Sequence, residues 1–209
     1  MKILFYGDSI TDAGRTRDID APNKGLGGTY VSYVATKLID RDPIAYEIYN
    51  RGISGNRIVD LYARVKKDCW NIKPDVISIL IGINDIWHEL SHQNGVEVDR
   101  FERIYRMLLE DTRKVLPDVK FILCEPFVLE GTATVEKMDK FSEVTEYANV
   151  VKKLAKEFDA QLVLLQDMFT ELGEKYGNDL LLSDGVHPTL TGGVYLGNAW
   201  LRAFDAMEK

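Results

Sequence analysis

The sequence predicts an α/β protein in which one parallel β-sheet lies between two layers of helices, a three-layer α/β/α sandwich. Three observations carry this prediction. Short, β-rich apolar segments alternate with longer segments of helical periodicity, as in repeated β-α-β units. The segment Val76–Ile81 is apolar at almost every position, as a strand covered on both faces should be. The 209 residues fit one domain, 1–209, and contain no segment with the composition of a linker.

Five strands are expected, and they are Lys2–Tyr6, Ala45–Asn50, Val76–Ile81, Phe121–Cys124 and Gln161–Leu165. Helices are expected where apolar residues recur three and four positions apart. These segments are Thr29–Asp40, Arg57–Asn71, Asp99–Leu116, Lys140–Asp159 and Leu190–Met207. The longest expected loop is Asp12–Gly28, which is rich in glycine, aspartate and arginine, and loops of this length usually have a function.

The bulk composition excludes several function classes. A net charge of −7 argues against binding to nucleic acid or to an anionic membrane, because both require clustered Lys and Arg. The apolar run at the N-terminus is too short for a membrane span or a signal-peptide core. Only Cys69 and Cys124 are present, without metal-binding or disulfide-scaffold spacing, so we expect reduced thiols in a cytoplasmic protein.

Ligands of open parallel sheets bind beyond the carboxyl ends of the strands, so the residues after each strand are the most informative. In chain order, these segments read GDSIT, NRGISGN, GINDIW, EPF and QDMF. All five should meet at one rim of the sheet. We therefore expect the functional site there.

The rim segments contain the groups that a serine hydrolase needs: a hydroxyl nucleophile, an imidazole base and a carboxylate that orients the imidazole. Ser9 follows the first strand in the turn Gly7-Asp8-Ser9-Ile10. His187 and Asp184 lie three residues apart on one short loop, close enough to share a hydrogen bond. Each segment alone is equally typical of an ordinary turn or helix cap.

The same rim offers donors for the oxyanion that forms during acyl transfer. Backbone N–H groups of the glycine-containing turn Gly52–Gly55 are one source, and the side-chain amide of Asn84 is another. Taken singly, each of these residues is also a normal choice for a turn. The combination of all the pieces in one chain is what favours an active site.

The ordered blocks GDSIT, GISGN, GIND and DGVHP resemble those of the SGNH, or GDSL, hydrolases, from residue 5 to residue 193. The resemblance implies a flavodoxin-like sandwich with five parallel strands. It also implies that Ser9 is the nucleophile, His187 the base and Asp184 its partner. The oxyanion hole would consist of the N–H groups of Ser9 and Gly55 and the side chain of Asn84. This chemistry requires no cofactor and no metal.

The residues flanking these blocks most resemble bacterial esterases that remove acetyl groups from xylo-oligosaccharides. An acetylated oligosaccharide is therefore the expected substrate, and Asp8, Trp87 and Phe127 are candidate substrate contacts, although Trp87 and Phe127 fit packing equally well. A general short-chain lipase, thioesterase or lysophospholipase acting on a non-sugar ester is the alternative. The resemblance also implies a possible homo-oligomer, to which Trp200 or exposed tyrosines could contribute.

Two alternatives belong to other protein classes. His88-Glu89-Leu90-Ser91-His92 fits the H-E-x-x-H pattern of zinc proteases, and a carboxylate such as Glu97 or Glu102 would have to be the third ligand. The turn residues Gln93-Asn94-Gly95 leave little helix for that pair, so a loop or short helix is expected there. A non-catalytic carbohydrate-binding protein could use Trp70, Trp87 and Trp200 for stacking, but such a protein would gain nothing from the complete set of catalytic groups.

Overall fold

A five-stranded, all-parallel sheet forms the centre of the protein. The computed structural model describes residues 1–18 and 20–207; residue 19 of the predicted long loop and residues 208–209 of the predicted domain lie outside it. The sheet has the order β2-β1-β3-β4-β5. Its strands are β1 (Lys2–Gly7), β2 (Glu47–Asn50), β3 (Val76–Leu80), β4 (Lys120–Cys124) and β5 (Gln161–Val163). The predicted fold class is confirmed.

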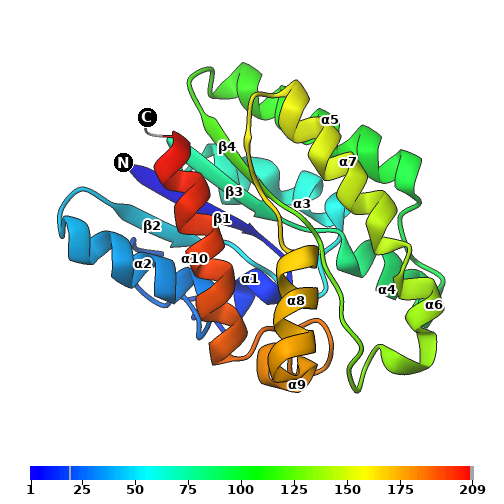
Figure 1. Ribbon diagram of the computed structural model, residues 1–209. Coiled ribbons are helices and arrows are strands. Elements are labelled where there is room, and N and C mark those ends of the chain that lie inside the picture. The colour runs from blue at the N-terminus through cyan, green and yellow to red at the C-terminus, as the bar shows by residue number, and fades with distance from the viewer. Residues whose placement is uncertain (19, 208–209) are drawn as a thin grey trace.

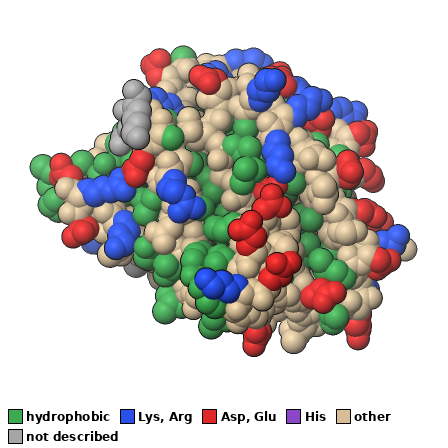
Figure 2. Space-filling view, in the orientation of Figure 1, with side chains coloured by type: hydrophobic (Ala, Val, Ile, Leu, Met, Phe, Trp, Pro, Cys, Tyr) green, Lys and Arg blue, Asp and Glu red, His purple; other side chains and the backbone are tan. Residues whose placement is uncertain are grey.

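Helices cover both faces of this sheet (Figure 1). On one face, α3 (Ile58–Val65), α5 (Val98–Val115) and α7 (Val144–Glu157) pack side by side. On the other, α2 (Tyr30–Arg41) packs against α10 (Leu190–Met207), which also contacts β4 and β5. Acidic side chains run over α8 (Gln166–Tyr176) on the face shown in Figure 2.

The strand order places a topological switch point between β1 and β3. These strands pair directly, from Ile3 with Val76 to Gly7 with Leu80, although β2 lies between them in sequence. The helices that follow β1 and β3 leave toward opposite faces, so the two carboxyl ends border an open crevice. This is the rim at which the sequence places Ser9 and Asn84.

The core is built around β3, whose apolar side chains are at most 1% exposed. Ser78 is the one polar residue in this strand, and its hydroxyl accepts a hydrogen bond from Trp200 Nε1 at 2.8 Å. Trp200 is fully buried, and Trp70 packs against the core and donates to Thr112 Oγ1. Neither a stacking surface nor an oligomer interface can therefore use Trp200, which corrects those two expectations.

Some element boundaries differ from those expected. The predicted helix Arg57–Asn71 is α3 followed by a π-helical turn, Lys66–Trp70, and Lys140–Asp159 is interrupted between α6 (Met138–Phe141) and α7. Helices α8 and α9 (Asn178–Leu181) were not predicted. The loop or short helix expected at His88–His92 is the second half of a ten-residue helix, α4 (Ile83–His92). The remaining short helices are α1 (Ser9–Asp12) and a 3-10 turn, Val135–Lys137. Only Phe169 and Gly173 of α8 are buried, so few apolar residues mark its inner face and the sequence pattern did not predict this helix.

Cys69 and Cys124 are separate, buried thiols, as predicted. Burial raises the pKa of each thiol to about 12, so both are protonated at neutral pH. Within residues 1–18 and 20–207, no helix is both long enough and apolar enough to cross a membrane.

Replacing Trp200 with alanine should lower the free energy of unfolding by about 3–5 kcal/mol, because it leaves a large cavity and removes the hydrogen bond to Ser78. Urea denaturation of the variant and the wild type measures this difference. Leu190→Ala is the control on the same helix, because Leu190 is 75% exposed; its change should stay within about 0.5 kcal/mol. Equal effects of the two substitutions would contradict the assignment of Trp200 to the core.

Candidate active site

Ser9 is placed by the sharp connection between β1 and α1. Asp8 precedes the helix and accepts a hydrogen bond from the Ile10 N–H on Oδ1 at 3.0 Å, which caps the first turn. Gly7 is required before it, because a Cβ at this position would lie 2.4 Å from the carbonyl oxygen of Leu80 on β3. Ser9 is thus the first residue of α1, at the switch point between β1 and β3.

Three predicted side chains form a continuous hydrogen-bonded chain. Ser9 Oγ lies 2.8 Å from His187 Nε2, and His187 Nδ1 lies 2.7 Å from Asp184 Oδ2. The imidazole side chain is 37% exposed, so a substrate can approach it. With the Nδ1 proton directed to Asp184, Nε2 is free to accept the hydroxyl proton of Ser9.

The loop that carries Asp184 and His187 is rigidly folded. The second carboxylate oxygen, Oδ1, accepts the N–H groups of Val186 and His187, both at 2.9 Å. Gly185 has φ +99°, and a Cβ there would lie 2.4 Å from Thr134 Oγ1. The position of the imidazole is therefore fixed by backbone geometry as well as by its own hydrogen bonds.

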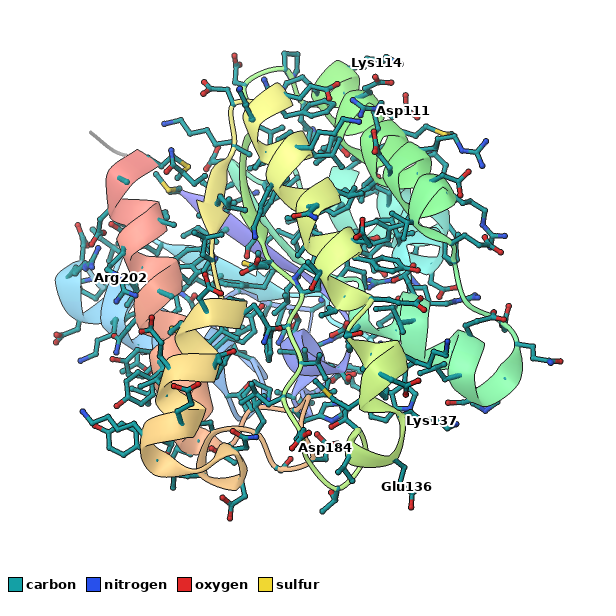
Figure 3. All side chains as sticks on the ribbon, turned by 45° about the vertical axis from the view of Figure 1, so that its right-hand side comes forward. Asp111, Lys114, Glu136, Lys137, Asp184 and Arg202 are labelled. Atoms are coloured by element: carbon teal, nitrogen blue, oxygen red, sulfur yellow. The ribbon has the colours of Figure 1, made fainter. Side chains whose placement is uncertain are left out.

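A second segment, the connection that follows β4, supports this loop. Gly131 packs so closely that a Cβ on it would lie 2.3 Å from the Asp184 carbonyl carbon, and Leu129 N–H donates to Gly185 O. In Figure 3, Asp184 lies at the same end of the molecule as Glu136 and Lys137. The connection after β4 thus forms one wall of the site.

The residues predicted as oxyanion donors come from the turn after β2 and from the start of α4. Gly55 has φ +81°, a conformation that glycine adopts freely, and it is partly exposed. Asn84 lies in the first turn of α4 and is 6% exposed; its Nδ2 donates one hydrogen to Asn56 O at 3.1 Å. An amide nitrogen carries two hydrogens, so the second remains for a ligand.

Residues outside the predicted set fix the Gly52–Gly55 turn. Asn50 accepts the Gly52 N–H on Oδ1 and donates from Nδ2 to Thr11 O, which ties the turn to α1. Asp12 Oδ2 accepts both the N–H and the hydroxyl of Ser54, at 3.0 and 3.1 Å. Gly52 must be glycine, because a Cβ would lie 2.2 Å from Asp12 N. Asn50 is the last residue of β2 and Asp12 the last of α1, so their place beside the GISGN and GDSIT segments was the sequence feature that pointed to them.

Three carboxyl groups near the site have altered pKa values. Burial alone would raise the pKa of Asp184, but the hydrogen bonds from His187 and Val186 outweigh it and hold this pKa below its usual value. For Asp8, burial dominates and raises the pKa to about 7. Burial also raises the pKa of Asp85, which accepts the Ile58 N–H. Asp184 is therefore ionised at neutral pH, whereas burial disfavours the ionised forms of Asp8 and Asp85.

Two of the three predicted substrate contacts are corrected by their burial. Asp8 and Phe127 are both 0% exposed; Phe127 packs on Phe169 with ring centroids 4.5 Å apart. Trp87 is half-buried, and its ring centroid lies 6.1 Å from that of His187. Of the three, only Trp87 presents an aromatic surface beside the hydrogen-bonded chain.

The H-E-x-x-H histidines lie on one helix, because α4 continues to His92 and ends at Gln93 in a left-handed cap. The ring centroids of His88 and His92 are 5.8 Å apart. Neither proposed third ligand joins them: Glu102 pairs with Arg106 and Lys153, and no group of three His, Cys, Asp or Glu side chains in the described part of the chain is arranged to hold a metal. The zinc protease alternative lacks a ligand set.

Comparisons with known proteins identify the family of this chain. The profile of the GDSL-like lipase/acylhydrolase family matches residues 5–193. An acetylxylan esterase from Geobacillus stearothermophilus is 37% identical over 207 residues, covering 96% of this chain and 92% of that protein. Its crystal structure has a TM-score of 0.86 at 36% identity, covering 97% of this chain and 93% of that one. A protein described as a GDSL-like lipase, from Parabacteroides merdae, has a TM-score of 0.92 at 39% identity, covering 97% and 94%.

The fold and these relationships define a carboxylic ester hydrolase, an enzyme of the acylhydrolase class. The chain belongs to the GDSL-like lipase/acylhydrolase family.

The buried carboxyl of Asp8 should make stability depend on pH. Its pKa is about 7 in the folded protein and about 3.9 in an unfolded chain, so between these values the folded state holds a proton that the unfolded state has lost. The contribution of Asp8 to stability is therefore complete below pH ~4 and is lost as pH rises toward 7. Relative to Asp8→Asn, the wild type should lose on the order of 4 kcal/mol across this window.

Urea denaturation of both proteins at pH 4.5, 5.5, 6.5 and 7.5 measures the effect. Asp118→Asn, at an exposed carboxylate, is the control and should keep a constant difference from the wild type. A pH-independent difference between Asp8→Asn and the wild type would show that Asp8 ionises normally in the folded protein.

Proposed function

We propose that this enzyme is a serine esterase that removes acetyl groups from carbohydrate, with Ser9 as nucleophile. The observation that carries the proposal is the unbroken chain from Ser9 Oγ through His187 to Asp184, with distances of 2.8 and 2.7 Å. Solved structures of the Geobacillus acetylxylan esterase include variants described as catalytic mutants, in which a serine or an aspartate is replaced by alanine. These descriptions support a serine and an aspartate as catalytic residues in this chain as well.

In the proposed reaction, His187 Nε2 takes the proton of Ser9 as the hydroxyl oxygen attacks the ester carbonyl. Asp184 stabilises the resulting imidazolium. The N–H groups of Ser9 and Gly55 and the free amide hydrogen of Asn84 would hold the oxyanion of the tetrahedral intermediate. His187 then gives the proton to the leaving alcohol, and an acetyl-Ser9 ester remains.

The second half of the reaction uses the same groups. His187 removes a proton from water, which attacks the acetyl-Ser9 carbonyl and forms a second oxyanion in the same position. Collapse of this intermediate releases acetate and returns the proton to Ser9. Because every proton transfer passes through the His187 imidazole, this mechanism requires a fixed orientation of the ring.

A sugar substrate is supported by the family relationship and by Trp87. Sugar rings pack well against aromatic faces, and Trp87 contacts both His187 and Phe141, with ring centroids 6.1 and 5.6 Å away. A cavity of about 190 Å³ is lined by Trp87 and Phe141 and by Thr132 and Ala133 of the connection after β4. We place one sugar unit of the substrate on this side of the site.

Ser9→Ala should abolish turnover, because no other hydroxyl lies in hydrogen-bond contact with His187 Nε2 among the described residues. The measurement is acetate release from acetylated xylo-oligosaccharides, with p-nitrophenyl acetate, butyrate and octanoate in parallel. Ser142→Ala, at an exposed hydroxyl, is the control and should retain wild-type rates. Wild-type rates in Ser9→Ala would overturn the nucleophile. Cleavage of the nitrophenyl esters with an inert sugar would retain the nucleophile and overturn the carbohydrate substrate.

Asn84→Ala should lower kcat about 10²–10³-fold with little change in KM, because its amide would contact the oxyanion and not the ground-state ester. Steady-state kinetics with p-nitrophenyl acetate provide the test. Since Asn84 also donates to Asn56 O, a thermal melt must show that the variant is folded. A rise in KM at constant kcat would assign Asn84 to substrate binding instead of transition-state stabilisation.

A further inference from the structure

A second, strongly polar cavity lies beyond the carboxyl end of the edge strand β2. It has a volume of about 350 Å³. Cationic side chains dominate its lining, and the charged residues are Arg15, Arg17, Arg51 and Lys67, with the carboxylates of Asp20 and Asp68. Four cations against two carboxylates are unusual in a chain whose net charge is −7.

The cations of this cavity, called here the arginine pocket, are only partly neutralised. Arg17 pairs with Asp12 at 2.5 Å, and Arg51 pairs with Asp20. Asp68 pairs with Arg64, at 3.0 Å, and not with a cation of the pocket. Neither Arg15 nor Lys67 has a carboxylate within 4.0 Å among residues 1–18 and 20–207. The pocket therefore carries surplus positive charge.

Arg15 lies among the other cationic side chains of the pocket. Its Nε donates to Gly52 O at 2.6 Å, which fixes the guanidinium in place. Burial lowers the pKa of Arg15, and the nearby guanidinium groups of Arg51 and Arg17 lower it further, against the attraction of Asp12. An anion in the pocket would relieve this repulsion. Positioned guanidinium groups recognise planar oxyanions well, because their N–H groups match the two oxygens of a carboxylate.

The arginine pocket is joined directly to the proposed oxyanion loop. Ile53 lines the pocket, and it lies two residues before Gly55, a separation of at most about 7.6 Å between Cα atoms. Asp12 links the two sites a second time, because it pairs with Arg17 and accepts both hydrogen bonds from Ser54. A short oligosaccharide can therefore span the distance from Ser9 to the pocket.

We propose that the arginine pocket is a substrate subsite that binds the carboxylate of an acidic sugar unit, such as a uronic acid, in the acetylated oligosaccharide. This inference rests on the proposed carbohydrate esterase function. The acidic unit would lie beside Lys67 and Arg15, whose side chains have no carboxylate within 4.0 Å in the described part of the chain, while the acetyl ester lies at Ser9. The enzyme would then prefer acidic over neutral acetylated oligosaccharides.

The kinetic test compares kcat/KM for two acetylated xylo-oligosaccharides of equal length, one with a uronic acid branch and one without. Wild type should prefer the acidic substrate about tenfold, as expected for a hydrogen-bonded charge pair. Lys67→Glu should abolish the preference. Lys66→Glu introduces the same charge change at the neighbouring exposed residue, which does not line the pocket, and should retain it. Equal values for the two substrates in the wild type would overturn the proposal.

A binding test separates this proposal from the esterase function. Calorimetric titration of D-glucuronate, D-glucose and inorganic phosphate into the wild type and both Lys variants requires no turnover. Glucuronate binding that Lys67→Glu weakens about tenfold and Lys66→Glu leaves intact supports the subsite, even if acetylated sugars prove inert and the proposed function fails. Binding of phosphate without glucuronate, or of neither anion, overturns it.

Discussion

The close approach of two backbones holds the proposed active site together. Gly52 lies against α1 so tightly that a Cβ would be 2.2 Å from Asp12 N. This contact sets the distance between Ser9, on α1, and the turn that presents Gly55. Asn50 and Asp12 then hold the turn from both sides with buried hydrogen bonds. Because neither backbone can move without breaking several of these bonds, the proposed nucleophile and oxyanion donors are positioned before any substrate arrives.

Close backbone contacts also hold the loop that carries Asp184 and His187. Gly131 and Gly185 allow the connection after β4 to contact the loop of Asp184 and His187 backbone to backbone. The imidazole is thus held by a rigid loop as well as by the 2.7 Å bond to Asp184. We expect selectivity among esters to come from the side chains around these loops, chiefly Trp87 beside His187 and the proposed arginine pocket beside the Gly52–Gly55 turn.

The sequence predicts the strands and the order of the functional blocks well because both are local patterns. Five apolar runs became the five strands, and Ser9, Asp184 and His187 occur in short motifs at strand and helix ends. Burial is not local: Phe127 follows a strand as a rim residue does, yet it packs inward on Phe169. Helix α4 ends at the predicted turn, but it begins at Ile83 and is ten residues long.

Asp8 and Asp85 are buried acidic residues near the proposed site, and burial disfavours their charged forms. Asp8 and Asp85 each have one carboxyl oxygen without a hydrogen-bond partner in the described part of the chain, although Asp8 caps α1 and Asp85 receives the Ile58 N–H. Ionising both would place two unpaired negative charges in the core. Burial raises the pKa of both groups, because a protonated carboxyl costs far less to bury than a carboxylate. Asp184 can then be the negative charge that stabilises an imidazolium at His187.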